Sequence, residues 1–404
     1  MRPEEPERSR EAESRASREA KDGAIRFQRP QLPSDSEIGR YFALAREERW
    51  FSNGGPCHRL LSERIASFLG RDLEVVLVAN ATLGLMLALR SLVGDTPAGS
   101  RVIVPSFTFP ATAQAISWNG LRPIWVDVEP RGWHLDPDAL TDALTEHGDE
   151  VAAVLACSTF GTAPGSSQVR AWQTACERAS VPLLIDSAAG FGSSDEHGDL
   201  LGGNGDAEVF SFHATKPFGI GEGGAVVTRD RELARRLSAM TNFAFDEQRS
   251  IESPFGLNAK MSELHAATGL ALLDNFDDVL LQRRTAAESL RASLESAGYV
   301  FQAGAEHSSW QFVPVLAPTV EVRASVIAAA SERAIEVRAY HEPLHTMRAF
   351  AGVSLAQSGL PETDELAARA LSLPLANDLS AREVSRIAEL LLDCVGSPAE
   401  QVTP

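Results

Sequence analysis

Four polar segments of the chain each follow directly after a short apolar run. They supply small residues at a helix start, an aromatic ring, a carboxylate, a hydroxyl and an amine, and they lie at 80–82 (NAT), 106–109 (SFTF), 186 (Asp) and 211–216 (SFHATK). In an open α/β sheet, the residues that follow the strands meet at the carboxyl edge of the sheet. We therefore expect these different chemical groups to converge on one site.

Lys216 is the residue of this set that most needs an explanation. It stands after the apolar run 207–212 and before the glycine-rich corner 219–224, and a second apolar run follows. An ammonium group between two buried strands loses hydration free energy unless it is paired or converted to an uncharged form. A lysine that forms a Schiff base with an aldehyde meets this requirement.

Together these groups predict a site for pyridoxal 5′-phosphate. The aldehyde of this cofactor requires a lysine, here Lys216, and its ring nitrogen requires a carboxylate, here Asp186. Its phosphate suits helix-start amides and hydroxyl groups, as at Thr82 and Ser211, and its flat ring suits an aromatic partner such as Phe109. Each residue also has a structural alternative: a surface lysine, helix caps at Asp186 and Thr82, and a core phenylalanine.

The apolar runs that carry these residues alternate with helical stretches over the first 250 residues. The runs lie at 73–80, 101–109, 122–128, 150–158, 182–188, 207–212 and 224–230. Such strands, separated by helices, indicate a mostly parallel sheet covered on both faces. The glycine-rich corner between the last two runs predicts one antiparallel pair. Residues 35–70 are predicted to be helical, with a turn at 52–56.

A change of pattern near residue 250 divides the chain. Residues 262–298 favour a long helical stretch, and a mixed segment with apolar runs follows. We therefore expect a disordered tail at 1–24, a large α/β domain at 25–250, and an interdomain helix with a small C-terminal α/β domain at 251–404. The tail is rich in Glu and Arg and has no apolar residues to anchor it.

The composition argues against several classes of protein. The net charge is −18, from 37 Lys and Arg against 55 Asp and Glu, whereas a nucleic-acid-binding protein needs a basic patch. The four cysteines are scattered without metal-ligand spacing, so we expect free thiols and no metal site. No apolar run reaches the roughly 20 residues that span a bilayer, and the first residues carry no secretory signal. The sequence therefore predicts a cytoplasmic protein without nucleic-acid or membrane partners.

Four motifs of the chain resemble the DegT/DnrJ/StrS family of nucleotide-sugar aminotransferases. They are PSFTFPATAQAI (105–116), IDSAAG (185–190), FSFHATKPFGIGEGGAVVT (210–228) and FGLNAKMSELHAATGLALL (255–273). The resemblance runs from about residue 27 to about residue 395. It implies the α/β fold of aspartate aminotransferase, which is fold type I of the pyridoxal-phosphate enzymes. That fold has a large, mostly parallel, seven-stranded sheet domain and a smaller C-terminal α/β domain.

The resemblance also implies roles around the cofactor. Lys216 would carry the cofactor as an aldimine and shuttle a proton, Asp186 would pair with the pyridinium nitrogen, and Phe109 would cover the ring. The phosphate contacts that it implies are Thr82, the amide of Leu83, and Ser211.

Further roles concern a partner subunit and the substrate. Asn258 and Lys260 resemble a segment that reaches into the partner's site, which implies a homodimer with shared active sites. His213, Lys260 and His345 are candidate substrate contacts, and surface or packing roles for these three remain open. The chain also departs from the family's pattern, because Ala189 stands where relatives usually have a glutamine that bonds the cofactor's phenolic oxygen, and Lys260 stands where arginine is commoner.

The main hypothesis is therefore an aminotransferase of deoxyaminosugar biosynthesis. It would move an amino group from an amino acid, by resemblance glutamate, to the C4 ketone of dTDP-4-keto-6-deoxyglucose. Amination of a 3-keto sugar is the alternative within the same class. The sugar dehydratases of this family replace the lysine with histidine, so Lys216 argues against them. A non-catalytic regulatory protein on the same fold is the third class, against which the intact Lys216 and Asp186 argue.

Overall fold

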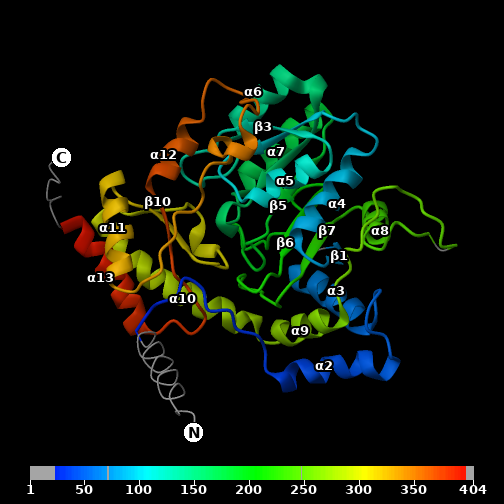
Figure 1. Ribbon diagram of the computed structural model, residues 1–404, viewed down its shortest axis with the longest axis horizontal. Coiled ribbons are helices and arrows are strands. Elements are labelled where there is room, and N and C mark those ends of the chain that lie inside the picture. The colour runs from blue at the N-terminus through cyan, green and yellow to red at the C-terminus, as the bar shows by residue number, and fades with distance from the viewer. Residues whose placement is uncertain (1–22, 71, 247, 397–404) are drawn as a thin grey trace, which may run out of the picture.

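The computed structural model describes residues 23–70, 72–246 and 248–396, so that most of the predicted tail at 1–24 lies outside the described residues. Its centre is a seven-stranded sheet with the order β1-β7-β6-β5-β4-β2-β3 (Figure 1). The strands are β1 (Glu74–Val78), β2 (Arg101–Pro105), β3 (Arg122–Val126), β4 (Val151–Cys157), β5 (Leu183–Asp186), β6 (Ala207–Ser211) and β7 (Gly224–Thr228). The predicted α/β class and seven-stranded sheet are confirmed.

The prediction of one antiparallel pair is wrong, because the sheet contains two. β7 pairs antiparallel with β6 and also with β1, whereas the pairs among β6, β5, β4, β2 and β3 are parallel. The chain reverses direction at the glycine-rich corner, and β7 then enters between two strands that run the same way. Both neighbours of β7 are therefore antiparallel to it.

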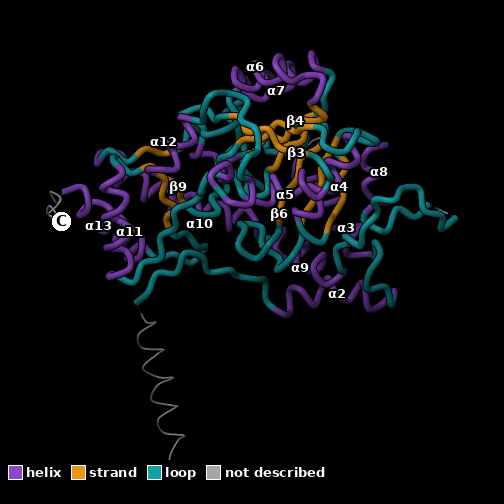
Figure 2. Tube along the Cα trace, turned by 45° about the horizontal axis from the view of Figure 1, so that its top comes forward, coloured by secondary structure: helices purple, strands orange, loops and turns teal. Residues whose placement is uncertain are grey.

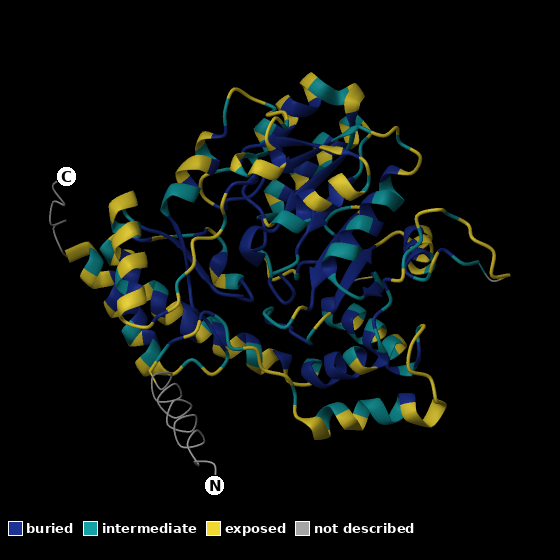
Figure 3. Cartoon of the chain, viewed as in Figure 1, coloured by how far each residue is buried: buried dark blue, intermediate teal, exposed yellow. Residues whose placement is uncertain are grey.

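Helices cover both faces of this sheet. Successive side chains of β2 point to opposite faces, and each face packs against a different set of helices. Val102 and Val104 pack with α4 (Ala81–Val93), α5 (Pro110–Trp118) and α8 (Arg231–Met240). Ile103 between them packs against α6 (Pro137–His147) and α7 (Ser166–Ala179), which lie beyond the strands in Figure 2. Because the strands are mostly apolar on both faces, most of the sheet is buried, except near the first residues of β1, β2 and β3 (Figure 3).

The C-terminal part forms a smaller three-stranded antiparallel sheet with the order β10-β9-β8. Its strands are β8 (Val300–Phe301), β9 (Val313–Leu316) and β10 (Ala370–Leu373), and its helices are α10 (Phe276–Leu294), α11 (Val320–Glu332), α12 (Pro361–Arg369) and α13 (Ala381–Gly396). The 3-10 turns of the described chain are Gly148–Glu150, Thr159–Gly161, Glu295–Ala297, Ala305–His307, Leu344–Thr346 and Arg348–Phe350. Ile25 pairs with Ile335 and joins this smaller core, although the sequence placed residue 25 in the large domain.

The helices between the two sheets differ in one respect from the prediction. The long helical stretch expected from residue 262 is two helices, α9 (Glu263–Leu273) and α10, which separate at Asp274. Asp274 binds Arg64 at 2.8 Å and also binds Arg40, and Arg40 belongs to α2 (Asp35–Glu48). The predicted turn before α3 (Pro56–Leu69) is confirmed. In the part of the chain that is described, no helix combines the length and the apolar character needed to span a membrane.

Candidate active site

Lys216 lies in a tight turn at the carboxyl end of β6. The amide of Lys216 donates to the carbonyl of His213 at 2.8 Å, and the amide of Ala214 donates to the carbonyl of Gly221 at 2.8 Å. A Cβ at Gly219 would lie 2.6 Å from the carbonyl oxygen of Ala214, so no other residue fits there. The glycine-rich corner thus explains how the chain turns back and leaves the lysine at the sheet edge.

The amine of Lys216 is partly buried and has a neutral partner. Its Nζ donates to Oε1 of Gln311 at 2.8 Å, and Gln311 belongs to the smaller domain. Burial lowers the pKa of Lys216 to about 8, and the negative charge of Asp186 opposes this shift. An amine with this pKa is uncharged in roughly a tenth of the molecules at pH 7, far more than an ordinary lysine, and a nucleophile and proton carrier requires this form.

Asp186 ends β5 as a buried carboxylate with two neutral donors. Oγ1 of Thr112 donates to its Oδ2 at 2.7 Å, and the amide of Ala188 donates to its Oδ1 at 3.0 Å. Burial raises the pKa of Asp186, while these hydrogen bonds and the charge of Lys216 act in the opposite direction. The carboxylate is therefore fixed and poorly hydrated, and it lies close enough to Lys216 for the charges to interact.

The start of α4 lies beside the end of β6, as the sequence predicted. Ser211 pairs with Gly224, and a Cβ at Gly224 would lie 3.0 Å from the amide nitrogen of Ala81. Asn80 caps α4 by accepting a hydrogen bond from the amide of Leu83 at 3.0 Å. The amide of Leu83, one of the predicted phosphate contacts, is therefore already engaged. The amides of Ala81 and Thr82 precede it in a turn where the helix supplies no backbone acceptor.

Phe109 stands at the first position before α5 and is 61% exposed. Its ring lies 6.5 Å from the ring of His341, at an interplanar angle of 66°. A large apolar side chain in this position is not part of the core, so the core alternative for Phe109 does not apply. Its exposure at the sheet edge leaves the ring available to a flat ligand.

The candidate substrate contacts lie in less direct positions. His213 is exposed, and its Nδ1 lies 2.9 Å from Oγ1 of Thr215, while Nε2 lies 3.7 Å from Glu222. Nζ of Lys260 donates to Oδ1 of Asn242 at 2.9 Å, and burial lowers the pKa of Lys260.

Asn258 and His345 also contact residues other than Lys216. Asn258 is exposed and forms a bridge with Asn242, at the base of a segment that projects from the body between α8 and α9 (Figure 1). Nδ1 of His345 lies 2.8 Å from Oγ of Ser106, and Nε2 lies 3.4 Å from Oδ1 of Asp364.

Sequence reasoning missed three residues of the site. Thr112 holds Asp186, Gln311 holds Lys216, and His341 lies beside both Phe109 and the charge of Lys216. Thr112 lies in the PATAQ segment next to the predicted strand, so its position one turn into a helix was a usable signal. Gln311 and His341 come from the smaller domain, and no spacing in the sequence connects them with the lysine.

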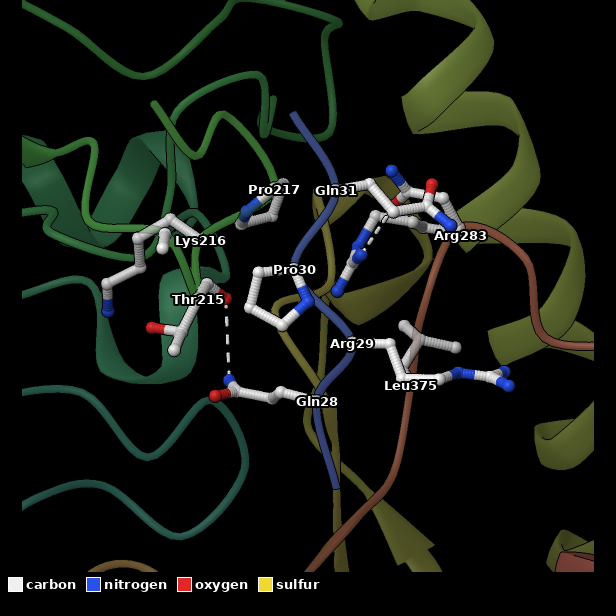
Figure 4. Close-up of a pocket in the computed structure, with 11 residues that line it drawn as sticks. Gln28, Arg29, Pro30, Gln31, Thr215, Lys216, Pro217, Arg283 and Leu375 are labelled. Carbon is white, nitrogen blue, oxygen red and sulfur yellow. Dashed lines mark hydrogen bonds between the residues drawn. The ribbon is translucent and has the colours of Figure 1, made fainter. Parts of the chain in front are cut away.

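A hollow that Lys216 also lines lies on the side away from its amine. Figure 4 shows the lysine side chain pointing away from Pro30, which lines this hollow together with Gln28 and Arg283. Arg283 is buried and donates to the carbonyls of Trp310 at 2.7 Å and Gln311 at 2.8 Å. The N-terminal segment, the turn of Lys216 and the smaller domain therefore meet at this hollow.

The residues present fit pyridoxal phosphate. A desolvated amine and a desolvated carboxylate occur in one site, the carboxylate has only neutral donors, and an exposed aromatic ring stands at the edge. The start of α4 beside Ser211, where the amides of Ala81 and Thr82 precede the capped amide of Leu83, suits a phosphate group. Ala189 stands in place of the expected glutamine, and its carbonyl oxygen accepts a hydrogen bond from Oγ of Ser309 at 3.2 Å. Groups of three or more side chains suited to hold a metal ion are absent from the described residues.

Comparison with known proteins places this arrangement in a family. The model of the DegT/DnrJ/EryC1/StrS aminotransferase family matches residues 34–392. A dTDP-4-amino-4,6-dideoxy-D-glucose transaminase of Shigella dysenteriae is 30% identical over 71% of this chain and 76% of its own.

Two solved structures are also similar. A Bacillus cereus protein described as a PLP-dependent aminotransferase is 34% identical, with a TM-score of 0.84 over 91% of this chain and 99% of that one. DesI, solved in the presence of its TDP-sugar product, is 34% identical, with a TM-score of 0.82 over 92% and 93% of the two chains.

Proposed function

Since this chain belongs to the DegT/DnrJ/EryC1/StrS aminotransferase family, we propose that it transfers an amino group from an amino acid to the ketone of a nucleotide-linked sugar. The observation that carries the proposal is the partly buried amine of Lys216, which has a lowered pKa and interacts with the fixed carboxylate of Asp186. The preferred acceptor is the C4 ketone of dTDP-4-keto-6-deoxyglucose, and the preferred donor is glutamate. The Shigella dysenteriae relative and DesI support the choice of a thymidine-diphospho sugar.

The site residues divide the binding of the cofactor among them. Asp186 would hold the protonated ring nitrogen, Phe109 would cover the ring, and Ser211 and the first amides of α4 would hold the phosphate. When bound, pyridoxal phosphate supplies a carbonyl that links to amines and a ring that withdraws electrons from the neighbouring carbon. Thr112 keeps Asp186 in place through the hydrogen bond at 2.7 Å.

Lys216 performs the proton transfer in this proposal. Its Nζ must accept a proton from the amino-acid Cα and deliver it elsewhere, so it has to exist both as amine and as ammonium near neutral pH. A pKa of about 8 allows both forms. Gln311 accepts a hydrogen bond from Nζ and limits the positions that the amine can take.

The active unit in this proposal is a homodimer with shared sites. The projecting segment between α8 and α9 carries apolar side chains that are exposed in the single chain, namely Phe243, Ile251 and Phe255. Exposed apolar side chains gathered on one segment are typical of a surface that a partner covers. Asn258 at the base of this segment would then contribute to the site of the partner subunit.

Product analysis tests the proposed reaction. The protein loaded with pyridoxal phosphate is incubated with glutamate and a panel of nucleotide sugars that carry a ketone at C4 or at C3, linked to TDP, UDP or GDP. We expect an amino sugar from the TDP-linked 4-keto compound, together with an equal amount of 2-oxoglutarate. Amination of the 3-keto compound alone would select the alternative substrate, and amination of none of the panel would refute the proposed function.

A further inference from the structure

His341 lies among the aromatic residues that follow β2 and β4. Its ring stacks on Phe160 with a centroid distance of 4.7 Å and an interplanar angle of 7°. The ring of Phe107 meets it edge-on at 5.7 Å, and the ring of Phe109 lies 6.5 Å away. These contacts fix the plane of the imidazole, so that its two nitrogens have defined directions.

The segment that carries His341 is fastened to the end of β2. The amide of Leu344 donates to the carbonyl of Ser106 at 3.0 Å, and the amide of His345 donates to Oγ of Ser106 at 3.0 Å. The side chain of His345 uses Nδ1 toward Ser106 and Nε2 toward Asp364. Both nitrogens of His345 are therefore engaged in holding the segment, although the sequence made His345 the candidate sugar contact.

The nitrogens of His341 differ from those of His345. Neither has a hydrogen-bond partner within the described part of the chain, and neither belongs to the buried polar atoms that lack a partner there. Neither nitrogen is therefore fully buried, and the half-buried ring lies beside exposed Phe109. Burial and the positive charge of Lys216 lower the pKa of His341 to about 3, so the ring is neutral. A neutral imidazole has one donor and one acceptor, which suits a hydroxyl group.

We propose that His341 is a specificity-determining residue whose imidazole hydrogen-bonds a hydroxyl group of the sugar that presents its ketone to Lys216. This inference rests on the proposed function and deepens it. The position supports a sugar rather than the amino-acid donor, because a neutral ring offers no charge to the donor's carboxylate. Phe107 and Phe160 also cover part of the imidazole with apolar rings, which offer no positive charge to bind a carboxylate.

The test separates the two halves of the reaction. His341→Phe keeps a flat ring for Phe160 but removes both nitrogens, whereas His341→Gln keeps a donor and an acceptor. One neutral hydrogen bond corresponds to roughly a tenfold change. For the keto sugar that the wild-type protein aminates, we expect His341→Phe to raise KM about tenfold and to raise the calorimetric Kd of the amino-sugar product by a similar factor. His341→Gln should recover part of this loss.

The other half-reaction and a matched control make the result specific. The rate at which glutamate alone changes the absorbance of the loaded protein should be the same in His341→Phe and the wild type. His197→Phe, the same substitution at an exposed histidine away from the site, should change neither quantity. Unchanged KM and Kd in His341→Phe, or an equal loss in the glutamate reaction, would overturn the role of His341 while the proposed function stands. If the wild type aminates no sugar, the proposed function fails, and the role of His341 fails with it.

Discussion

Replacement of Asp186 by asparagine removes one charge from the site and almost nothing else. The Oδ1 atom of an asparagine can accept the hydrogen bond that Ala188 donates, and its Nδ2 can donate to the hydroxyl of Thr112, which rotates to accept it. The fold should therefore survive. The loss of charge should reduce transamination by orders of magnitude, because a neutral amide does not hold a protonated ring nitrogen.

The same substitution should raise the stability of the cofactor-free protein or leave it unchanged. Burial raises the pKa of Asp186, so the folded state binds its proton more tightly than the unfolded state. Stability therefore falls as the pH rises from the ordinary carboxyl pKa through the raised value. Each unit of the raised pKa corresponds to about 1.4 kcal/mol. The neutral side chain of the Asp186→Asn variant would not carry this cost, and the difference from the wild type should disappear in acid.

Urea unfolding at several pH values, together with turnover at neutral pH, measures both effects. Asp206→Asn is the matched control, because Asp206 accepts from the amide of Leu183 at the opposite end of β5. This control should keep its activity. Near-normal turnover in Asp186→Asn would refute the assigned role. Cofactor-free Asp186→Asn that is clearly less stable than the wild type at neutral pH would refute the electrostatic reasoning.

Borohydride reduction of the loaded protein should fix the cofactor to the peptide that contains Lys216, and a label on any other lysine would contradict the assignment. A mixture of Lys216→Ala and Asn258→Ala chains should be more active than either parent, because a mixed dimer with sites shared in trans keeps one intact site; a fully active monomer in sedimentation would exclude sharing. Glu263→Gln should lower the free energy of unfolding by about 1–2 kcal/mol, because the buried carboxylate accepts from the amides of Cys57 at 2.7 Å and His58 at 3.2 Å at the start of α3. An unchanged urea midpoint would show that this carboxylate does not stabilise α3.

The sequence was sufficient for those parts of the site that follow strands. Asp186, Ser211 and Lys216 come directly after β5 and β6, and parallel strands present their carboxyl ends at one edge, so order along the chain predicts proximity in space. The antiparallel pairing of β1 with β7 was not predictable in this way. It depends on the position of β7 in the sheet, between β1 and β6. The break between α9 and α10 depends on the contacts of Asp274 with α2 and α3, which no local pattern contains.

Burial explains the unusual pKa of Lys216, and two residues that the sequence missed are part of the surroundings of its amine. Asp186 of the large domain supplies a charge that favours the ammonium form, whereas Gln311 and His341 of the smaller domain are neutral. An amide oxygen compensates only part of the hydration free energy that a buried ammonium loses. The uncharged amine is therefore favoured, and the pKa falls. Gln311 is in turn held by buried Arg283, which binds the carbonyl oxygens of Trp310 and Gln311. We therefore expect the pKa of the lysine to depend on how the smaller domain packs against the large one. Arg283→Met, which removes the hydrogen bonds to the carbonyls of Trp310 and Gln311, should shift it.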